Sequence, residues 1–105
     1  MHTEIVSLIA MLNEAASILR RHSLINWASW LERDARLIER SDFDGIEHLL
    51  SAYGGMGSIN DVGLGEPDPE NVGLLRPHHD DSRLQELIAE IHSLATQLSR
   101  EEQVR

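Results

Sequence analysis

Four neighbouring residues have types that could bind a metal ion. His78, His79, Asp80 and Asp81 offer imidazole and carboxylate groups, which are common ligands of divalent cations. Adjacent ligands rarely converge on one ion unless others join them at helical spacing. His92 lies nearby in sequence, but it completes no His-Glu-x-x-His pattern. We therefore expect no metal and no cofactor here, and instead a polar lead-in to a helix with acids at its start.

A glycine-rich turn is the second candidate for chemistry. Gly54, Gly55 and Gly57 interrupt a helix-forming sequence, which indicates backbone with positive φ or close approach. Successive backbone N–H groups in such a turn can form an anion-binding nest. The spacing is not that of a phosphate loop, which ends in Gly-Lys-Ser/Thr and follows a strand. Ser58 and Asn60 are turn residues whose side chains bond to nearby backbone. A rigid structural turn is the preferred interpretation, with an anion site or a partner contact as alternatives.

Acid–base and nucleophilic chemistry find little support. Glu86 and Glu90 lie one helical turn apart on the side expected to face solvent. His22 and His48 are isolated in sequence. No Ser/His/Asp set has members that can be argued to meet, and cysteine is absent from the chain. We expect a protein that is not an enzyme.

Two tryptophans suggest a contact surface. Trp27 and Trp30 are three residues apart, so on a helix they cover adjacent ground. One of them is expected in the core, because tryptophan buries a large area. The other is a candidate anchor for a protein partner.

Composition limits the classes of partner. The 105 residues fit one domain. All nine cations are arginine, set against 18 carboxylates, and the formal net charge is −9. Phosphate binding needs clustered positive charge, so direct binding to nucleic acid is disfavoured, whereas a basic protein surface would be attracted. No apolar run is long enough for a signal peptide or a membrane span, which predicts a cytoplasmic protein.

The pattern of apolar residues predicts an all-α fold. Leucine, isoleucine and alanine recur at spacings of three and four in four stretches. We expect a single domain, residues 1–105, with four antiparallel helices at 3–22, 26–40, 42–53 and 82–100. The last helix should pack against the first. Asn26 is the expected N-cap of the second helix, Ser41 or Asp42 that of the third, and Ser82 opens a capping box for the fourth.

The segment 54–81 between the last two helices is too long for a plain connector. Its first part has Met56, Ile59, Val62 and Leu64 to bury and should be ordered. Its second part, 65–80, contains all three prolines and few apolar residues, so a mobile loop is expected.

Two runs carry a resemblance to known proteins. Asn-Trp-Ala-Ser-Trp-Leu-Glu-Arg-Asp at 26–34, and the run 45–61 that ends in Gly-Gly-Met-Gly-Ser-Ile-Asn-Asp, resemble a family of small, uncharacterised bacterial proteins. The resemblance covers roughly residues 5–98 and is most specific in the glycine stretch. It implies a compact helical domain and brings no catalytic residues. By type, and not by motif, the chain is also similar to immunity proteins encoded beside bacterial toxins.

These observations predict a protein-binding module, in particular an immunity protein or antitoxin-like inhibitor of a basic toxin domain. Carboxylates would occupy the toxin's cationic cleft in place of phosphates. The expected group is Asp61, Glu66, Asp68 and Glu70. Two alternatives stay open. One is a small enzyme or ligand-binding domain that uses the glycine turn, with a pocket where Asn60, Asp61 and a histidine converge. The other is a structural homodimer that pairs through the last helix.

Overall fold

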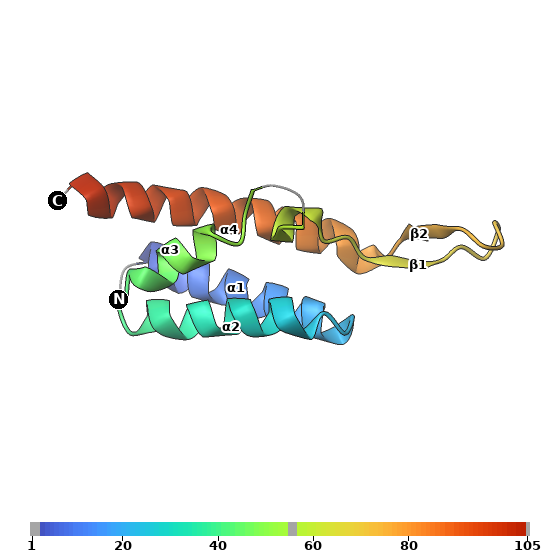
Figure 1. Cartoon of the computed structure of the whole chain (residues 1–105), viewed down its shortest axis with the longest axis horizontal. Coiled ribbons are helices and arrows are strands. Elements are labelled where there is room, and N and C mark those ends of the chain that lie inside the picture. The colour runs from blue at the N-terminus through green and yellow to red at the C-terminus, as the bar shows by residue number, and fades with distance from the viewer. Residues whose placement is uncertain (1–2, 55–56, 105) are drawn as a thin grey trace.

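Helices make up most of the structure, a computed structural model in which residues 3–54 and 57–104 are described (Figure 1). The elements of these residues are α1 (Thr3–Arg21), α2 (Ile25–Glu39), α3 (Asp44–Leu50), a 3-10 turn η1 (Ile59–Asp61), β1 (Gly65–Pro67), β2 (Leu75–Pro77) and α4 (His79–Val104). The mainly helical fold expected from the sequence is confirmed, but the two-stranded sheet was not foreseen.

The helices pack around α1. Helix α1 lies against both α2 and α4, and the short α3 joins α2 to α4. Helices α1 and α4 run in opposite directions (Figure 1), so the expected packing of the last helix on the first is found. None of the described helices combines the length and the apolar character needed to cross a bilayer.

The core is built from the apolar stripes that the sequence indicated. Each helix contributes leucine, isoleucine or alanine at spacings of three and four, which places them on one face. The largest fully buried apolar side chains are Leu8, Leu12, Leu19, Leu31, Ile46, Leu49, Ile59, Leu84, Leu87 and Ile91. Ile59 belongs to η1, so the turn after α3 is anchored in the same core as the helices.

Helices α1 and α2 end in the same way. After α1, Ser23 adopts φ 63°, and after α2, Ser41 adopts φ 62°. The N–H of Leu24 donates to the carbonyl of Leu19 at 2.9 Å, and the N–H of Asp42 donates to that of Leu37 at 3.0 Å. These are the bonds of the Schellman motif, which usually places glycine at the left-handed position. Serine occupies that position in both helices.

The starts of α2 and α3 differ from expectation. Helix α2 begins at Ile25, so Asn26 lies inside the first turn and is not the N-cap. Helix α3 begins at Asp44, where the carboxylate of Asp42 accepts the backbone N–H of Asp44 at 3.0 Å. Helix α3 also ends at Leu50, earlier than predicted, because turn residues lead from there to the glycines.

Helix α4 is longer than predicted at both ends. It begins at His79, and the imidazole Nδ1 of His78 accepts the N–H of Asp80 at 3.0 Å, which caps the helix. Ser82 and Gln85 therefore lie within the helix and form no capping box. The amide of Gln85 instead donates to the carbonyl of Val62 at 2.7 Å and holds the segment after η1 against α4.

Residues 65–77 form a β-hairpin where an irregular loop was expected. Strands β1 and β2 are antiparallel and place Glu66 opposite Arg76. Near the tip, the N–H of Asp68 donates to the carbonyl of Leu74 at 3.0 Å, and Gly73 has φ 87°. The hairpin projects from the end of the helical body (Figure 1), and the molecule measures 56 × 23 × 21 Å.

Candidate functional site

The glycine turn is fastened by its own side chains. Gly54 and Gly57 adopt positive φ of 92° and 82°, as expected for a turn that needs glycine. Oδ1 of Asn60 accepts the N–H of Gly54 at 3.4 Å, and a carboxylate oxygen of Asp61 accepts the N–H of Gly57 at 2.6 Å. Ser58 donates to the same Asn60 oxygen at 3.4 Å. Two backbone donors that a nest would offer to an anion are therefore bound to side chains of the protein itself. The predicted turn residue Gly55 lies outside the described residues.

The four acids proposed for partner binding lie in two places. Asp61 belongs to the turn, whereas Glu66, Asp68 and Glu70 lie along the hairpin. Glu66 pairs with Arg76 across the strands at 3.3 Å. The carboxylate of Asp68 accepts the side-chain amide of Asn71 and the N–H of Glu70, both at 2.9 Å. The bond from the Asn71 side chain is the main reason that the pKa of Asp68 is lowered.

The hairpin also exposes apolar side chains. Val72, Leu74 and Leu75 are 99%, 61% and 75% exposed. Val72 and Leu74 belong to the tip, and Leu75 begins β2. No buried core residue of the described chain lies between Leu64 and Leu84, so the hairpin stands outside the core. Apolar side chains and carboxylates thus share one projecting element.

A buried carboxylate is the most unusual feature of the helical body. Asp34 on α2 is fully buried, and its Oδ1 lies 2.5 Å from Nδ1 of His48 on α3. The His48 side chain is 38% exposed and stacks on the indole of Trp30, with ring centroids 4.3 Å apart. The indole ring of Trp27 packs on that of Trp30, with ring centroids 5.5 Å apart. Both tryptophans are half-buried against the core, so the expectation that one of them is fully buried is wrong, and Trp30 is engaged with the Asp34–His48 pair.

Burial governs the electrostatics of Asp34. Desolvation raises the pKa of its carboxyl group, and the hydrogen bond from His48 opposes that rise without cancelling it. The indole N–H of Trp30 also lowers the pKa of the Asp34 carboxyl group. The contact between the indole N–H and that carboxyl group does not have the geometry of a hydrogen bond. The second carboxylate oxygen, Oδ2, has no hydrogen-bond partner among the described residues. The hydroxyl of Ser51 donates to the backbone carbonyl of His48, at 2.5 Å, and not to its ring.

The sequence analysis missed this pair because it treated His48 as isolated. The position of Asp34 among the apolar residues of α2 could have indicated the pair. Asp34 lies three residues after Leu31 and four before Ile38, which puts it on the buried face of α2. A carboxylate at such a position needs a partner, and a histidine on the neighbouring helix provides it.

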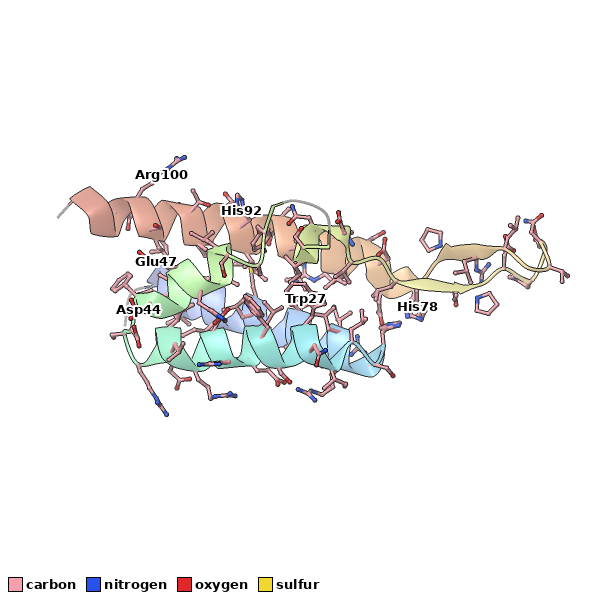
Figure 2. All side chains as sticks on the ribbon, in the orientation of Figure 1. Trp27, Asp44, Glu47, His78, His92 and Arg100 are labelled. Carbon is pink, nitrogen blue, oxygen red and sulfur yellow. The ribbon has the colours of Figure 1, made fainter. Side chains whose placement is uncertain are left out.

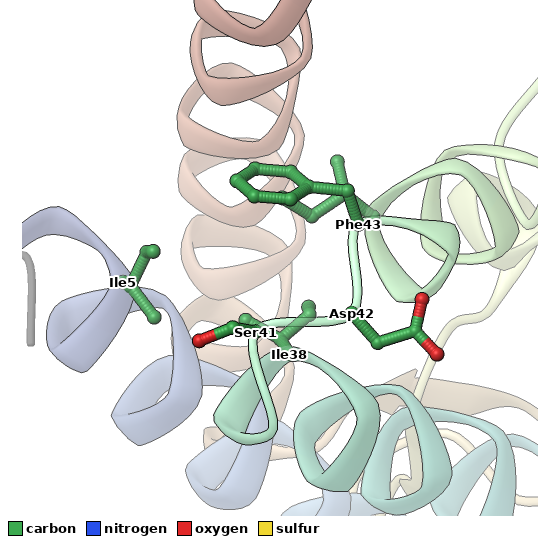
Figure 3. Close-up of a pocket in the computed structure, with 6 residues that line it drawn as sticks. Ile5, Ile38, Ser41, Asp42 and Phe43 are labelled. Carbon is green, nitrogen blue, oxygen red and sulfur yellow. The ribbon is translucent and has the colours of Figure 1, made fainter.

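Two concave surfaces of the described structure bear on the predicted sites. A small apolar cleft of about 30 Å³ lies where α1 meets the link between α2 and α3. It is lined by Ile5, Ile38, Ser41, Asp42, Phe43 and Ile46, which Figure 3 draws as sticks. A volume of that size holds about one water molecule. A wider groove of about 330 Å³ lies between the glycine turn and α4, lined by Tyr53, Asn60, Gln85, Ile88, Ala89 and His92. His92 is labelled on α4 in Figure 2.

This groove contains part of the constellation that the ligand-binding alternative required. Asn60 and His92 line it, but Asp61 does not. The ring of Tyr53 packs on that of His92, with centroids 4.7 Å apart, and its hydroxyl donates to the carbonyl of Ile88 at 2.7 Å. Burial raises the pKa of the Tyr53 hydroxyl, so this group acts as a neutral hydrogen-bond donor.

Comparison with known proteins gives one match. No curated protein and no solved structure shows significant similarity to the chain. A family described as "Domain of unknown function (DUF6966)" matches residues 20–69, from the last turn of α1 to two residues past the end of β1. The matched segment includes the buried pair of Asp34 and His48 and the glycine turn, and its description assigns no activity.

Proposed function

We propose that this chain is a non-enzymatic protein-binding module and that its hairpin, residues 65–77, is the recognition element. The observation that carries the proposal is the exposure of Val72, Leu74 and Leu75 on a projecting hairpin. Exposed apolar side chains that gather on one element are a mark of interaction sites. A two-stranded hairpin has little stability of its own. A partner would cover these side chains and would also pair with the open strand edges.

The charge of the chain favours a basic partner. The formal net charge is −9, and three of the carboxylates considered for binding lie on the hairpin. Opposite charge steers association and speeds it, with an effect that weakens as salt is added. An inhibitor of a bacterial toxin that acts on nucleic acid fits this description, because such a toxin needs a cationic cleft for phosphates. We therefore propose the immunity or antitoxin class for this module.

The contacts of the four acids support a choice among them for the recognition role. Asp61 and Asp68 use their carboxylates to hold the glycine turn and the hairpin tip. Glu66 makes only a cross-strand pair at the surface, which is worth little in stability. Glu70 lies exposed near the tip. Changes at Glu66 and Glu70 therefore test binding without removing the bonds that shape the hairpin.

The experiment expresses the protein encoded by the neighbouring gene, with and without this chain. We expect the neighbour to arrest growth and this chain to restore it through direct binding. Titration calorimetry at two salt concentrations should then show that Glu66→Gln with Glu70→Gln weakens binding by about tenfold or more at low salt. Val72→Ser with Leu74→Ser should weaken it at both salt concentrations, because apolar burial is not screened.

A matched variant controls for net charge. Glu39→Gln with Glu90→Gln removes the same two charges from the exposed surfaces of α2 and α4. This control should bind within about twofold of the parent, since those sites lie off the hairpin. If both double glutamine variants lose affinity equally, recognition by the hairpin carboxylates is wrong. If the hairpin variants all bind and protect as the parent does, the hairpin is not the recognition element.

The groove beside the glycine turn supports a second candidate, a ligand-binding domain. Its size is that of a small-molecule site, and it combines the apolar face of α4 with polar groups of Asn60, Gln85 and His92. Screening of a fragment library by NMR tests this candidate. Amide shifts that cluster on the groove and vanish in His92→Ala would favour ligand binding, whereas shifts that are absent or scattered would count against it.

A further inference from the structure

The base of the hairpin brings two histidines and an aspartate together from distant parts of the chain. His22 directly follows α1, and His78 and Asp80 flank the start of α4. Figure 2 labels His78 at the root of the hairpin. Nε2 of His22 lies 2.9 Å from Oδ2 of Asp80, and Nδ1 of His78 lies 3.7 Å from the same oxygen. One ligand atom from each of the three residues lies within 4.8 Å of the others.

We propose that His22, His78 and Asp80 form a binding site for a divalent transition-metal ion, with Zn²⁺ as the natural probe. Two imidazoles and one carboxylate are the ligand set that borderline metals prefer. Metal–ligand bonds of about 2.0–2.2 Å place tetrahedral ligands roughly 3.3–3.6 Å apart. The two measured separations bracket that range, so small rotations of the side chains complete the site. The inference does not depend on the proposed function.

The surroundings of the three side chains suit an accessible site. Their exposed fractions are between 18% and 20%, so all three side chains are partly accessible to solvent, as an ion with a water ligand requires. Three protein ligands with an open position are the arrangement of an open zinc site, in contrast to the closed four-ligand site of a zinc finger. His22 also lies at the C-terminal end of α1, where the helix dipole favours positive charge.

Two existing contacts compete with metal binding and lower the affinity of the site for the ion. The guanidinium of Arg21 lies 3.4 Å from Oδ2 of Asp80, but its side chain is 58% exposed and can turn toward solvent. Nδ1 of His78 accepts the N–H of Asp80, and coordination through either ring nitrogen gives up that bond. The ion must therefore replace the cap of α4, which moderates its affinity.

The two other members of the histidine–aspartate run, His79 and Asp81, lie outside the three-residue cluster. The carboxylate of Asp81 accepts the N–H of Leu64 at 2.9 Å and so joins α4 to the segment before β1. The His79 side chain is 81% exposed, and its Nε2 lies 3.6 Å from Oδ1 of Asp80, the oxygen that faces away from His22 and His78 in the measured contacts. Of the four residues considered from sequence, two enter the cluster, and the third ligand comes from 56 residues earlier, at His22. An ion bound there would tie the end of α1 to the root of the hairpin.

The test measures Zn²⁺ binding by the full chain after treatment with a chelator. Titration calorimetry should give one Zn²⁺ per chain, and Tm should rise by several degrees at saturating Zn²⁺. Co²⁺ should produce a visible d–d absorption band, and the ring signals of His22 and His78 should shift in NMR while that of His48 does not. No binding to the parent chain, or ring shifts at other histidines alone, would overturn the proposal.

Variants separate this site from adventitious binding. His22→Gln can still donate a hydrogen bond to Asp80 through its amide, so the fold should survive while a metal ligand is lost. We expect His22→Gln and Asp80→Asn each to weaken Zn²⁺ binding by about tenfold or more. His92→Ala, at an exposed histidine of α4, should bind as the parent does. Equal affinity in all of these variants would show that the cluster is an ion-pair network without a metal.

Discussion

Asp34 shows how one residue can set the electrostatics of a small helical domain. It is the fully buried charged side chain of the described core, and one of its two oxygens has a hydrogen-bond partner, His48. Burial of a carboxylate costs free energy unless it is paired, and removal of the partner costs more than the pair contributes. The pair thus adds little to the free energy of unfolding, but it requires Asp34 of α2 and His48 of α3 to lie side by side.

The first prediction separates the charge of Asp34 from its shape. Asp34→Asn keeps an oxygen for the His48 ring and removes the desolvated charge, so the free energy of unfolding should change by less than about 1 kcal/mol. Asp34→Ala leaves a void and an unpaired ring nitrogen, and should cost roughly 1–3 kcal/mol. Urea unfolding at neutral pH measures both. Equal losses in the two variants would mean that the charge itself is required.

The second prediction concerns pH. Because burial raises the pKa of Asp34 above its ordinary value of 3.8, the folded chain holds the proton to higher pH than the unfolded chain. Below the ordinary pKa, both the folded and the unfolded chain hold the proton, and the raised folded pKa contributes its full stabilisation. That stabilisation is lost as pH rises through the folded pKa. A His48→Gln background removes the imidazole that contacts the Asp34 carboxylate. In that background, the chain with Asp34 should lose stability relative to Asp34→Asn as pH rises from about 4 to about 8; a constant difference would contradict the raised pKa.

At the scale of elements, the ends of α1 and α2 use serine where glycine is usual. Left-handed backbone is strained for a residue with a Cβ, by about 1 kcal/mol or more. We predict that Ser23→Gly and Ser41→Gly each stabilise the protein by roughly 0.5–1 kcal/mol, because glycine removes that strain. Ser51, after α3, has φ −68° and provides the control. Ser51→Gly should destabilise, and stabilisation by all three changes would exclude the left-handed backbone as the cause.

The glycine turn gives the complementary prediction. A Cβ on Gly54 or Gly57 would meet no atom within 4 Å, so the cost of substitution is backbone strain alone. Gly54→Ala and Gly57→Ala should each lower the free energy of unfolding by about 1–2 kcal/mol. Gly63 is equally open but does not have positive φ. Thermal melts of Gly63→Ala should show no loss, and a similar loss at all three positions would contradict the argument from φ.

At the scale of the molecule, the hairpin and the helical body are separate in their stability. Every buried core residue of the described chain belongs to the helices, to Ala52, to η1 or to Leu64. Gly65 and Pro77 face each other at the root of the hairpin, within the usual distance of paired strand residues. Residues 66–76 can therefore be replaced by a two-residue glycine link without disturbing the core.

The deletion gives the last prediction. The shortened chain should keep its helical circular dichroism, and its Tm should stay within a few degrees of the parent, since no core contact is lost. Binding to the cognate partner should disappear. A large drop in Tm would show that the hairpin contributes to folding, and intact binding would move recognition to the helical body.

The sequence alone determined the helices, their inward faces and the glycine turn, because these depend on local periodicity and on backbone conformations that few residues adopt. The 3.6-residue repeat indicated the inward face of each long helix, and Leu8, Ile38 and Leu87 lie on those faces in the core. Positive φ at Gly54 follows from the same kind of local argument.

Tertiary structure decided the rest. The hairpin depends on pairing across a tip of seven residues in strands with no alternating pattern, which local signals do not encode. The contact of Asp34 with His48, and that of His22 with Asp80 across 58 residues, arise from how the helices pack against one another. Gly45 shows the same limit, since a Cβ there would lie 2.8 Å from that of Leu37, a closeness set by the crossing of α2 and α3. Residue types fix which groups can interact, but the packing of distant segments chooses which of them meet.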